Sequence, residues 1–169
     1  MSSETRLYLP VGFVKPEVIA NGSALIVPNA KLYHLGVLSS AMHMAWLRHV
    51  GGRMKSDYQM SARLVYNNFP WPQKVTERQV AAVEKAAQAV LDARAASPNA
   101  TLADLYNPLT MPDKLVKAHA KLDRAVDSCY RSKQFDNERL RIEFLFNLYT
   151  TIVTPLTAEP KKARKKKPA

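Results

Sequence analysis

The hydrophobic pattern divides the chain into a strand-like beginning and a helical remainder. Residues 6–14 and 18–27 are rich in branched and aromatic side chains and are interrupted by Pro, Gly and Asn-Gly, a pattern typical of short strands joined by turns. Apolar side chains then recur at near-helical spacing over residues 30–50, which predicts one long helix. It is expected to be capped by Asn29 and stopped by the Gly51-Gly52 pair, because glycine tolerates the left-handed backbone that ends a helix. The beginning of the chain is therefore predicted to be a small β element followed by a helix.

The second half of the chain has helical spacing almost throughout. Thr76 begins a Thr-Glu-Arg-Gln capping box and an Ala-rich helix that ends near Ser97. One or two helical turns are predicted at residues 101–106, and longer helices at residues 113–132 and 136–152. This half is therefore predicted to be a small helical bundle.

Between these parts lies a stretch from Gly51 to Pro72, GGRMKSDYQMSARLVYNNFPWP, that is more polar, basic and aromatic than a linker requires. The glycines at its start and the Pro-Trp-Pro at its end exclude a continuous helix or a central strand. A loop at residues 53–61 and a strand at residues 62–66 are predicted. Because charged, amide and aromatic side chains gather here, we interpret the stretch as a working surface, that is, a functional surface and not only a linker.

Net charge adds a partner class to this picture. A formal charge of +11 indicates an anionic partner, without distinguishing nucleic acid from a membrane surface or an acidic protein. Residues 1–73 carry seven Lys or Arg against three acids, residues 74–157 carry twelve against ten, and residues 158–169 carry six against one. The last of these segments has too little apolar content to fold and is predicted to be a disordered basic tail.

These observations predict an α+β fold in three parts. A content of 47% apolar residues is sufficient for a packed core in a chain of 169 residues. The first part, residues 1–73, combines the β element, the long helix and the loop at residues 53–61. The second, residues 74–157, is the helical domain, and the third, residues 158–169, is the tail.

Motifs for catalysis, metal binding and export are missing from the sequence. It contains no Gly-rich phosphate loop, no HExxH or GxSxG and no paired cysteines. The histidines lack companions at metal-ligand spacing, and Cys129 is expected to be buried. The segment that begins at Asp104, DLYNPL, departs from the (D/N)PPY motif of adenine methylation, because it has one proline and its tyrosine comes first. With neither a signal sequence nor a membrane span, we predict a cytoplasmic binding protein with no membrane partner.

The ordered segments LYHLGVLSSAMHMAW, GGRMKSDYQMS and VYNNFPWP resemble the target recognition region of MmeI-like (type IIL) restriction-modification enzymes and of related YeeA-like adenine DNA methyltransferases. LYLPVGFV resembles the β part of that region, and residues 74–155 resemble the helical C-terminal domain that follows it. The resemblance implies double-stranded DNA as partner. It also implies an S-adenosylmethionine-dependent methyltransferase domain of the same parent protein, which methylates adenine N6. The sequence contains no such domain, so we expect a non-catalytic C-terminal part of a longer protein.

The resemblance places base contacts between Lys55 and Gln59, where alternate residues form a specificity pair, here Lys55 and Asp57. A lysine can donate to O6 and N7 of guanine and an aspartate can accept from N4 of cytosine, so the two suit one G·C pair in the major groove. The alternative is an exposed ion pair between Lys55 and Asp57. Gln59 suits adenine N6 and N7, or it fixes the loop. The side chains expected to contact phosphate are those of Arg53, Ser56 and Arg63.

Two functions remain open for the whole chain. The first is a sequence-specific recognition module for double-stranded DNA in an adenine-N6 methyltransferase or restriction-modification protein. The alternative is a helical protein-interaction or RNA-associated accessory domain, whose charge resides chiefly in residues 158–169. The aromatic side chains are interpreted as core and hinge packing, with base stacking as the alternative; they are Tyr66, Phe69 and Trp71.

Overall fold

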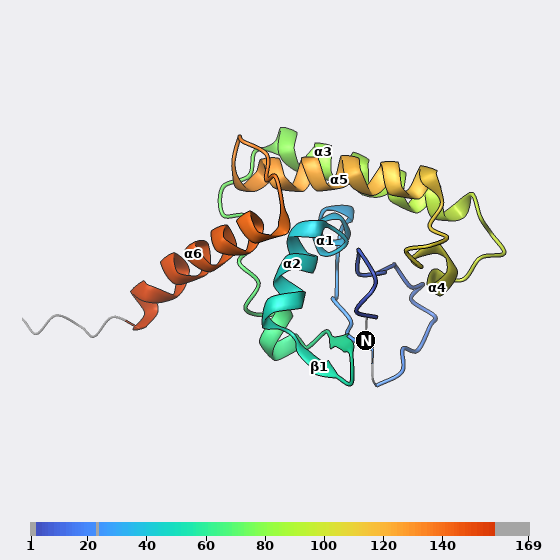
Figure 1. The fold of residues 1–169 in the computed structure, drawn as a ribbon, viewed down its shortest axis with the longest axis horizontal. Helices are drawn as coiled ribbons and strands as arrows, with labels where there is room; N and C mark the ends of the chain where they lie inside the picture. Colours follow the sequence, from blue (N-terminus) through green and yellow to red (C-terminus); the bar gives the residue numbers. More distant parts are fainter. Residues whose placement is uncertain (1–2, 23, 158–169) are drawn as a thin grey trace, which may run out of the picture.

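Helices dominate the part of the chain that the computed structural model describes, residues 3–22 and 24–157. The tail predicted at residues 158–169 lies outside the described residues. Two long helices, α3 (Glu77–Ala95) and α5 (Asp113–Tyr130), run antiparallel and lie side by side as one layer (Figure 1). The short helix α4 (Leu102–Leu105) lies in the connection between them. The helices predicted in this half are thus confirmed. Their capping residues and apolar spacing are local signals, which the sequence alone contains.

The predicted helix start at Thr76 is confirmed in its atomic detail. Thr76 Oγ1 accepts a hydrogen bond from the Gln79 amide at 3.3 Å, and Gln79 Oε1 accepts one from the Thr76 amide at 2.9 Å. The Gln79 side chain also donates to the Ser128 carbonyl of α5 at 2.6 Å. The cap therefore joins the two long helices. Cys129, one residue further along α5, is buried as expected.

The helix predicted over residues 30–50 is wrong in its continuity, because it is divided into α1 (Leu32–Leu38) and α2 (Ala41–Val50). Ser40 lies between them in extended backbone, with ψ of 162°. Its Oγ donates to the Val37 carbonyl at 2.7 Å and accepts from the His43 amide at 3.4 Å. A serine can thus end one helix and cap the next without interrupting the apolar spacing that suggested one helix.

Both predicted ends of that helix also differ from the structure. Asn29 does not cap it; Asn29 has φ of 55°, and α1 begins after Lys31, whose amide donates to His34 Nδ1 at 3.0 Å. Gly51 ends α2 with φ of −67°, which is not left-handed backbone. Glycine is needed there for space, because a Cβ at Gly51 would lie 2.5 Å from the carbonyl oxygen of Leu47.

The α1 helix crosses close beneath the α3–α5 layer at Gly36. A Cβ at Gly36 would lie 2.7 Å from Cγ1 of Val83 and 3.3 Å from Cδ1 of Leu122, shorter than ordinary van der Waals contact. The neighbouring Leu35 and Val37 are buried. The first and second halves of the sequence therefore share one hydrophobic core.

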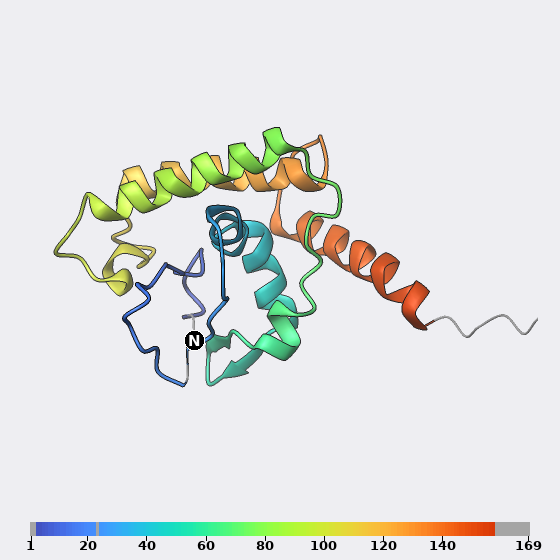
Figure 2. The ribbon, with the colours of Figure 1, turned by 180° about the vertical axis from the view of Figure 1, so that it is seen from behind.

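The strands predicted at residues 6–14 and 18–27 do not form. In the described residues the sheet pairs β1 (Gly52–Met54) with β2 (Asp57–Gln59), while the N-terminal segment follows an irregular path beside the helices (Figure 2). Branched residues form a strand only where a neighbouring segment supplies hydrogen-bond partners. The α+β class is confirmed, but its β part lies in the stretch predicted as a loop.

Side chains of the helices hold the N-terminal segment instead of a sheet. The Tyr8 hydroxyl donates to Asp123 Oδ2 at 2.8 Å, and the Tyr8 ring stacks on His119 with 3.9 Å between ring centroids. Arg94 Nη1 donates to the Val11 carbonyl at 2.5 Å. These three contacts reach α5 and α3, so the packing of the segment depends on residues more than 80 positions away.

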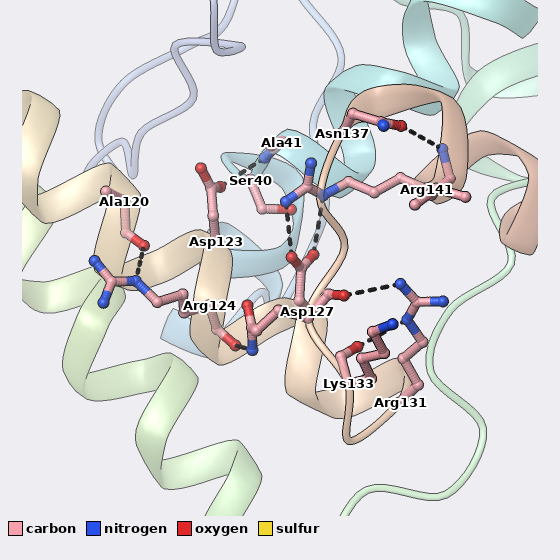
Figure 3. Close-up of polar contacts among 12 residues, drawn as sticks. Ser40, Ala41, Ala120, Asp123, Arg124, Asp127, Arg131, Lys133, Asn137 and Arg141 are labelled. Atoms are coloured by element: carbon pink, nitrogen blue, oxygen red, sulfur yellow. Dashed lines mark hydrogen bonds and ion pairs between the residues drawn. The ribbon is translucent and has the colours of Figure 1, made fainter.

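The last helix, α6 (Glu138–Thr157), makes its main contact with α2 and projects from the rest of the fold in both ribbon views (Figures 1 and 2). Its first turns are tied to α5 by Arg141, which donates to both carboxylate oxygens of Asp127 at 2.7 and 3.1 Å (Figure 3). Asp123, one turn earlier on α5, accepts from the Ala41 amide at 2.8 Å. Two aspartates of α5 therefore orient α2 and α6.

Candidate functional site

The stretch predicted as a working surface forms a β-hairpin instead of an irregular loop. Its register pairs Gly52 with Gln59, Arg53 with Tyr58 and Met54 with Asp57. Lys55 and Ser56 form the two-residue turn, and Lys55 has φ of 57°. Positive φ in a two-residue turn matches the twist of the flanking strands, so the backbone presents Lys55 at the tip.

One face of the hairpin is held against the protein by Tyr58. Its side chain is buried, and the Arg53 guanidinium lies 4.4 Å from its ring centroid. Arg53 also donates to the Tyr58 hydroxyl at 3.0 Å and to the Ser56 carbonyl at 3.4 Å, and it pairs with Glu4 at 3.5 Å. Arg53 therefore stiffens the hairpin, while half of its side chain remains exposed.

The opposite face of the hairpin carries Met54, Asp57 and Gln59, because side chains alternate along a strand and cross-strand partners share a face. Met54 and Gln59 are exposed and Asp57 is partly exposed. Across residues 3–22 and 24–157, neither Lys55 nor Asp57 takes part in an ion pair. The mutual ion pair considered as an alternative is thus not formed here.

The segment after the hairpin is a π-helix, η1 (Ala62–Tyr66), where a strand was predicted. The Tyr66 amide donates to the Ser61 carbonyl at 3.0 Å, five residues back, and Ser61 Oγ accepts from the Leu64 amide at 3.3 Å. Asn68 Nδ2 donates to the Arg63 carbonyl at 2.7 Å. Polar side chains at both ends therefore satisfy the backbone locally, and alternation in apolar residues alone does not reveal this.

Trp46 of α2 packs against η1. It is 1% exposed, and its indole Nε1 donates to the Val65 carbonyl at 3.1 Å. Phe69 is buried with its ring centroid 6.3 Å from that of Trp46 and 5.4 Å from that of Trp71. The interpretation of these aromatic residues as packing is confirmed for Phe69, and the same cluster includes Tyr66.

Five of the six candidate residues lie together on the hairpin, and the sixth, Arg63, lies on η1 with an exposed side chain. Two exposed apolar residues beside them, Met54 and Leu64, were missed by the sequence reasoning; they are 51% and 55% exposed. The position of Met54 opposite Asp57 follows only from the hairpin register. Spacing along the sequence contains no signal for it.

A hollow lies between the N-terminal segment and α1, and none of the six candidate residues lines it. It has a volume of about 550 Å³ and is bordered by apolar residues such as Leu9, Phe13 and Leu35; among the described residues that line it, Asn29 has the one polar side chain. Among the residues that the structure describes, no three His, Cys, Asp or Glu are grouped to hold a metal ion. In the same residues, no helix is long and apolar enough to cross a membrane.

Comparison with known proteins decides the family. The family model for the target recognition domain of MmeI matches residues 1–73, and the model for the C-terminal domain of MmeI matches residues 75–157. The chain belongs to the MmeI family. The resemblance inferred from the recognition stretch is thereby confirmed.

Two similar proteins are much longer than this chain. DNA methyltransferase A of Bacillus subtilis (strain 168) is 44% identical over 149 residues, which are 88% of this chain and 17% of that protein. A solved structure of the type IIL restriction-modification enzyme MmeI in complex with DNA matches with a TM-score of 0.86 and 49% identity. That match covers 90% of this chain and 20% of the MmeI chain. The chain thus spans about a fifth of the length of these relatives.

Proposed function

We propose that this chain is a sequence-specific recognition module for double-stranded DNA and that its hairpin, residues 52–59, contacts base edges in the major groove. The observation that carries the proposal is the outer face of the hairpin, which presents an acid, an amide and an apolar side chain on paired strands. The major groove admits a two-stranded β-ribbon. Similarity to MmeI, whose structure was solved in complex with DNA, supports the same partner.

Lys55 and Asp57 would contact one G·C pair. Lys55 at the tip would donate to O6 and N7 of guanine, and Asp57 at the start of β2 would accept from N4 of the paired cytosine. Because neither side chain has an ion-pair partner in the described residues, neither must leave an existing ion pair before it contacts a base. Leaving either base edge unpaired would weaken binding at that position alone.

The rest of the outer face extends the contact beyond one base pair. Gln59 lies two residues beyond Asp57 on the same strand face and suits N6 and N7 of adenine. Met54, opposite Asp57, offers an apolar surface of the kind that contacts the methyl group of thymine. Neighbouring side chains are assigned to phosphates, which position the protein without specifying sequence; they are Arg53, Ser56 and Arg63.

The modification chemistry would belong to a methyltransferase domain of the same parent protein that uses S-adenosylmethionine to methylate adenine N6. The hollow lined by Leu9 and Phe13 does not fit that cofactor, because the described residues of its lining include no carboxylate for the ribose hydroxyls and no aromatic cluster with polar partners. We therefore assign no catalytic step to the residues described here. Their role in the proposal is to select the DNA sequence.

An exchange of charge tests the assignment. The hairpin, residues 51–60, replaces its counterpart in the enzyme MmeI, and the modified DNA sites are sequenced with and without Lys55→Glu plus Asp57→Arg. The double exchange should switch one position from G·C to C·G, because an acid would then face cytosine and an arginine guanine. If the modified sites were unchanged, or if activity fell equally on all sequences, both residues would be assigned to phosphate contacts instead of base contacts.

A further inference from the structure

The outward face of α5 carries a row of four cations, Lys114, Lys117, Lys121 and Arg124, which we call the α5 ridge. Their spacing of three, four and three residues places them on one side of a helix. All four are exposed, whereas Leu115 and Leu122 on the other side are fully buried. From Lys114 to Arg124 the ridge spans ten residue-to-residue steps, or about 15 Å at the helical rise of about 1.5 Å per residue.

Acids do not neutralise the ridge. Within residues 3–22 and 24–157 none of its four side chains forms an ion pair. Asp123 and Asp127, which lie on the same helix, are directed toward α2 and α6, where Asp127 pairs with Arg141 (Figure 3). Asp113, the remaining acid of α5, is exposed at the start of the helix four residues before Lys117, so it offsets only one of the four positive charges.

The neighbouring helix differs in this respect. The α3 helix lies beside α5 in both ribbon views (Figures 1 and 2). The exposed surface of α3 carries charges of both signs. Its partly or fully exposed charged residues are Glu77, Arg78, Glu84, Lys85 and Asp92. A solvated helix surface usually mixes signs in this manner, so a row of a single sign on α5 requires a separate explanation.

We propose that the α5 ridge binds the phosphate backbone of DNA outside the base pairs that the hairpin contacts. The inference rests on the proposed function, because it takes double-stranded DNA as the partner. Phosphates of one strand follow each other at about 3.4 Å along the duplex axis, so a ridge of about 15 Å could face roughly four of them. Lysine and arginine on long stems adapt to such a row and specify no sequence.

The test measures binding of this 169-residue chain to duplex DNA by fluorescence anisotropy at several salt concentrations. The ridge variant carries Lys114→Gln, Lys117→Gln, Lys121→Gln and Arg124→Gln. A matched control removes three lysines and one arginine that are also exposed, through Lys15→Gln, Lys74→Gln, Arg78→Gln and Lys85→Gln. Both variants lower the net charge equally, and thermal melting shows whether each remains folded.

The ridge variant should bind every duplex more weakly and should lose about two to four units from the slope of log affinity against log salt, at about 0.9 unit per phosphate contact. The control should lose less than about one unit. Equal losses in both variants would overturn the ridge as a specific contact. Tighter binding of polyglutamate than of duplex DNA to the wild type, with that preference lost in the ridge variant, would favour an acidic protein as the partner and would also overturn it.

The same measurements separate this inference from the proposed function. If the hairpin exchange changes sequence preference while the ridge variant matches its control, the ridge proposal alone is wrong. If the ridge variant loses salt dependence while the hairpin exchange leaves every site unchanged, the ridge proposal stands without base contacts by Lys55 and Asp57. Deleting residues 158–169 from each variant keeps the comparison independent of that basic segment.

Discussion

The hairpin and the α5 ridge are both basic, but they present charge in different ways. On the hairpin, Lys55 is displayed by a left-handed turn, and Asp57 and Gln59 alternate on a paired strand. On the ridge, four cations of one sign project on flexible stems from a helix whose other side is buried. Mixed donors and acceptors on a stiff backbone suit base edges, whereas one repeated sign suits phosphates.

Both surfaces are supported by the same hydrophobic core, so a substitution in that core should have the largest effect on the protein. Replacing Trp46 by Ala should lower the free energy of unfolding by about 3–5 kcal/mol, because it opens a cavity and removes the hydrogen bond to the Val65 carbonyl. Urea denaturation measures the change. Trp71→Ala at the partly exposed end of the same cluster is the control and should cost clearly less. Equal costs would show that the hairpin support does not depend on Trp46.

Acid should weaken the shared core before it affects the lysines and arginines of either surface. Burial lowers the pKa of His43 to about 4, and burial together with the Arg94 charge lowers that of His119 to about 3. Unfolded histidine binds a proton below about pH 6.5, so each should remove about 1.4 kcal/mol of unfolding free energy per pH unit as pH falls below that value.

A carboxylate opposes this trend in part. Burial raises the pKa of Asp123 to about 6, so the folded state takes up a proton first, and this group favours folding as pH falls from about 6 to 4. The net loss between pH 7 and 5 should be on the order of 2–3 kcal/mol. Urea denaturation at both pH values measures it, and Asp123→Asn should enlarge the loss. A free energy independent of pH would contradict neutral, buried histidines.

Single changes at the hairpin should sharpen the contrast with the ridge. Lys55→Ala or Asp57→Ala should each cost on the order of 1–3 kcal/mol at one base pair, because a polar base edge loses its partner. Affinities for duplexes that differ only at that pair measure the effect. Lys117→Ala on the ridge is the control and should weaken all duplexes alike. A uniform loss for the hairpin variants would remove the distinction between the two surfaces.

The smallest effect should come from Met54. Met54→Ala should reduce the preference for thymine over uracil at one position by about 1 kcal/mol, the scale of one buried methyl or methylene group. Duplexes with single thymine-to-uracil replacements test this without altering hydrogen-bonding groups. Leu64→Ala, at an equally exposed apolar residue of η1, is the control. No difference at any thymine would place Met54 outside the base contacts.

Local signals in the sequence determined the helices of the second half. The Thr76 cap, the apolar stripe of α5 and the start of α6 each arise from residues within a few turns, so they are visible without tertiary structure. The spacing of Lys55 and Asp57 and the excess of cations were likewise readable. Their arrangement as a hairpin tip and as an α5 ridge that forms no ion pair with the described residues was not.

Tertiary contacts decided what local signals left ambiguous. Residues 6–14 have the composition of a strand, yet Tyr8 and Val11 are held by Asp123 and Arg94 from the far half of the chain. In the sequence Gly36 resembles any other helix residue, and only the packing of α3 against it shows that a side chain has no room there. A strand requires a second segment that supplies hydrogen-bond partners, and a close helix crossing requires a second helix; a short stretch of sequence specifies neither. The path of the N-terminal segment and the outer face of the hairpin were therefore decided by the tertiary structure.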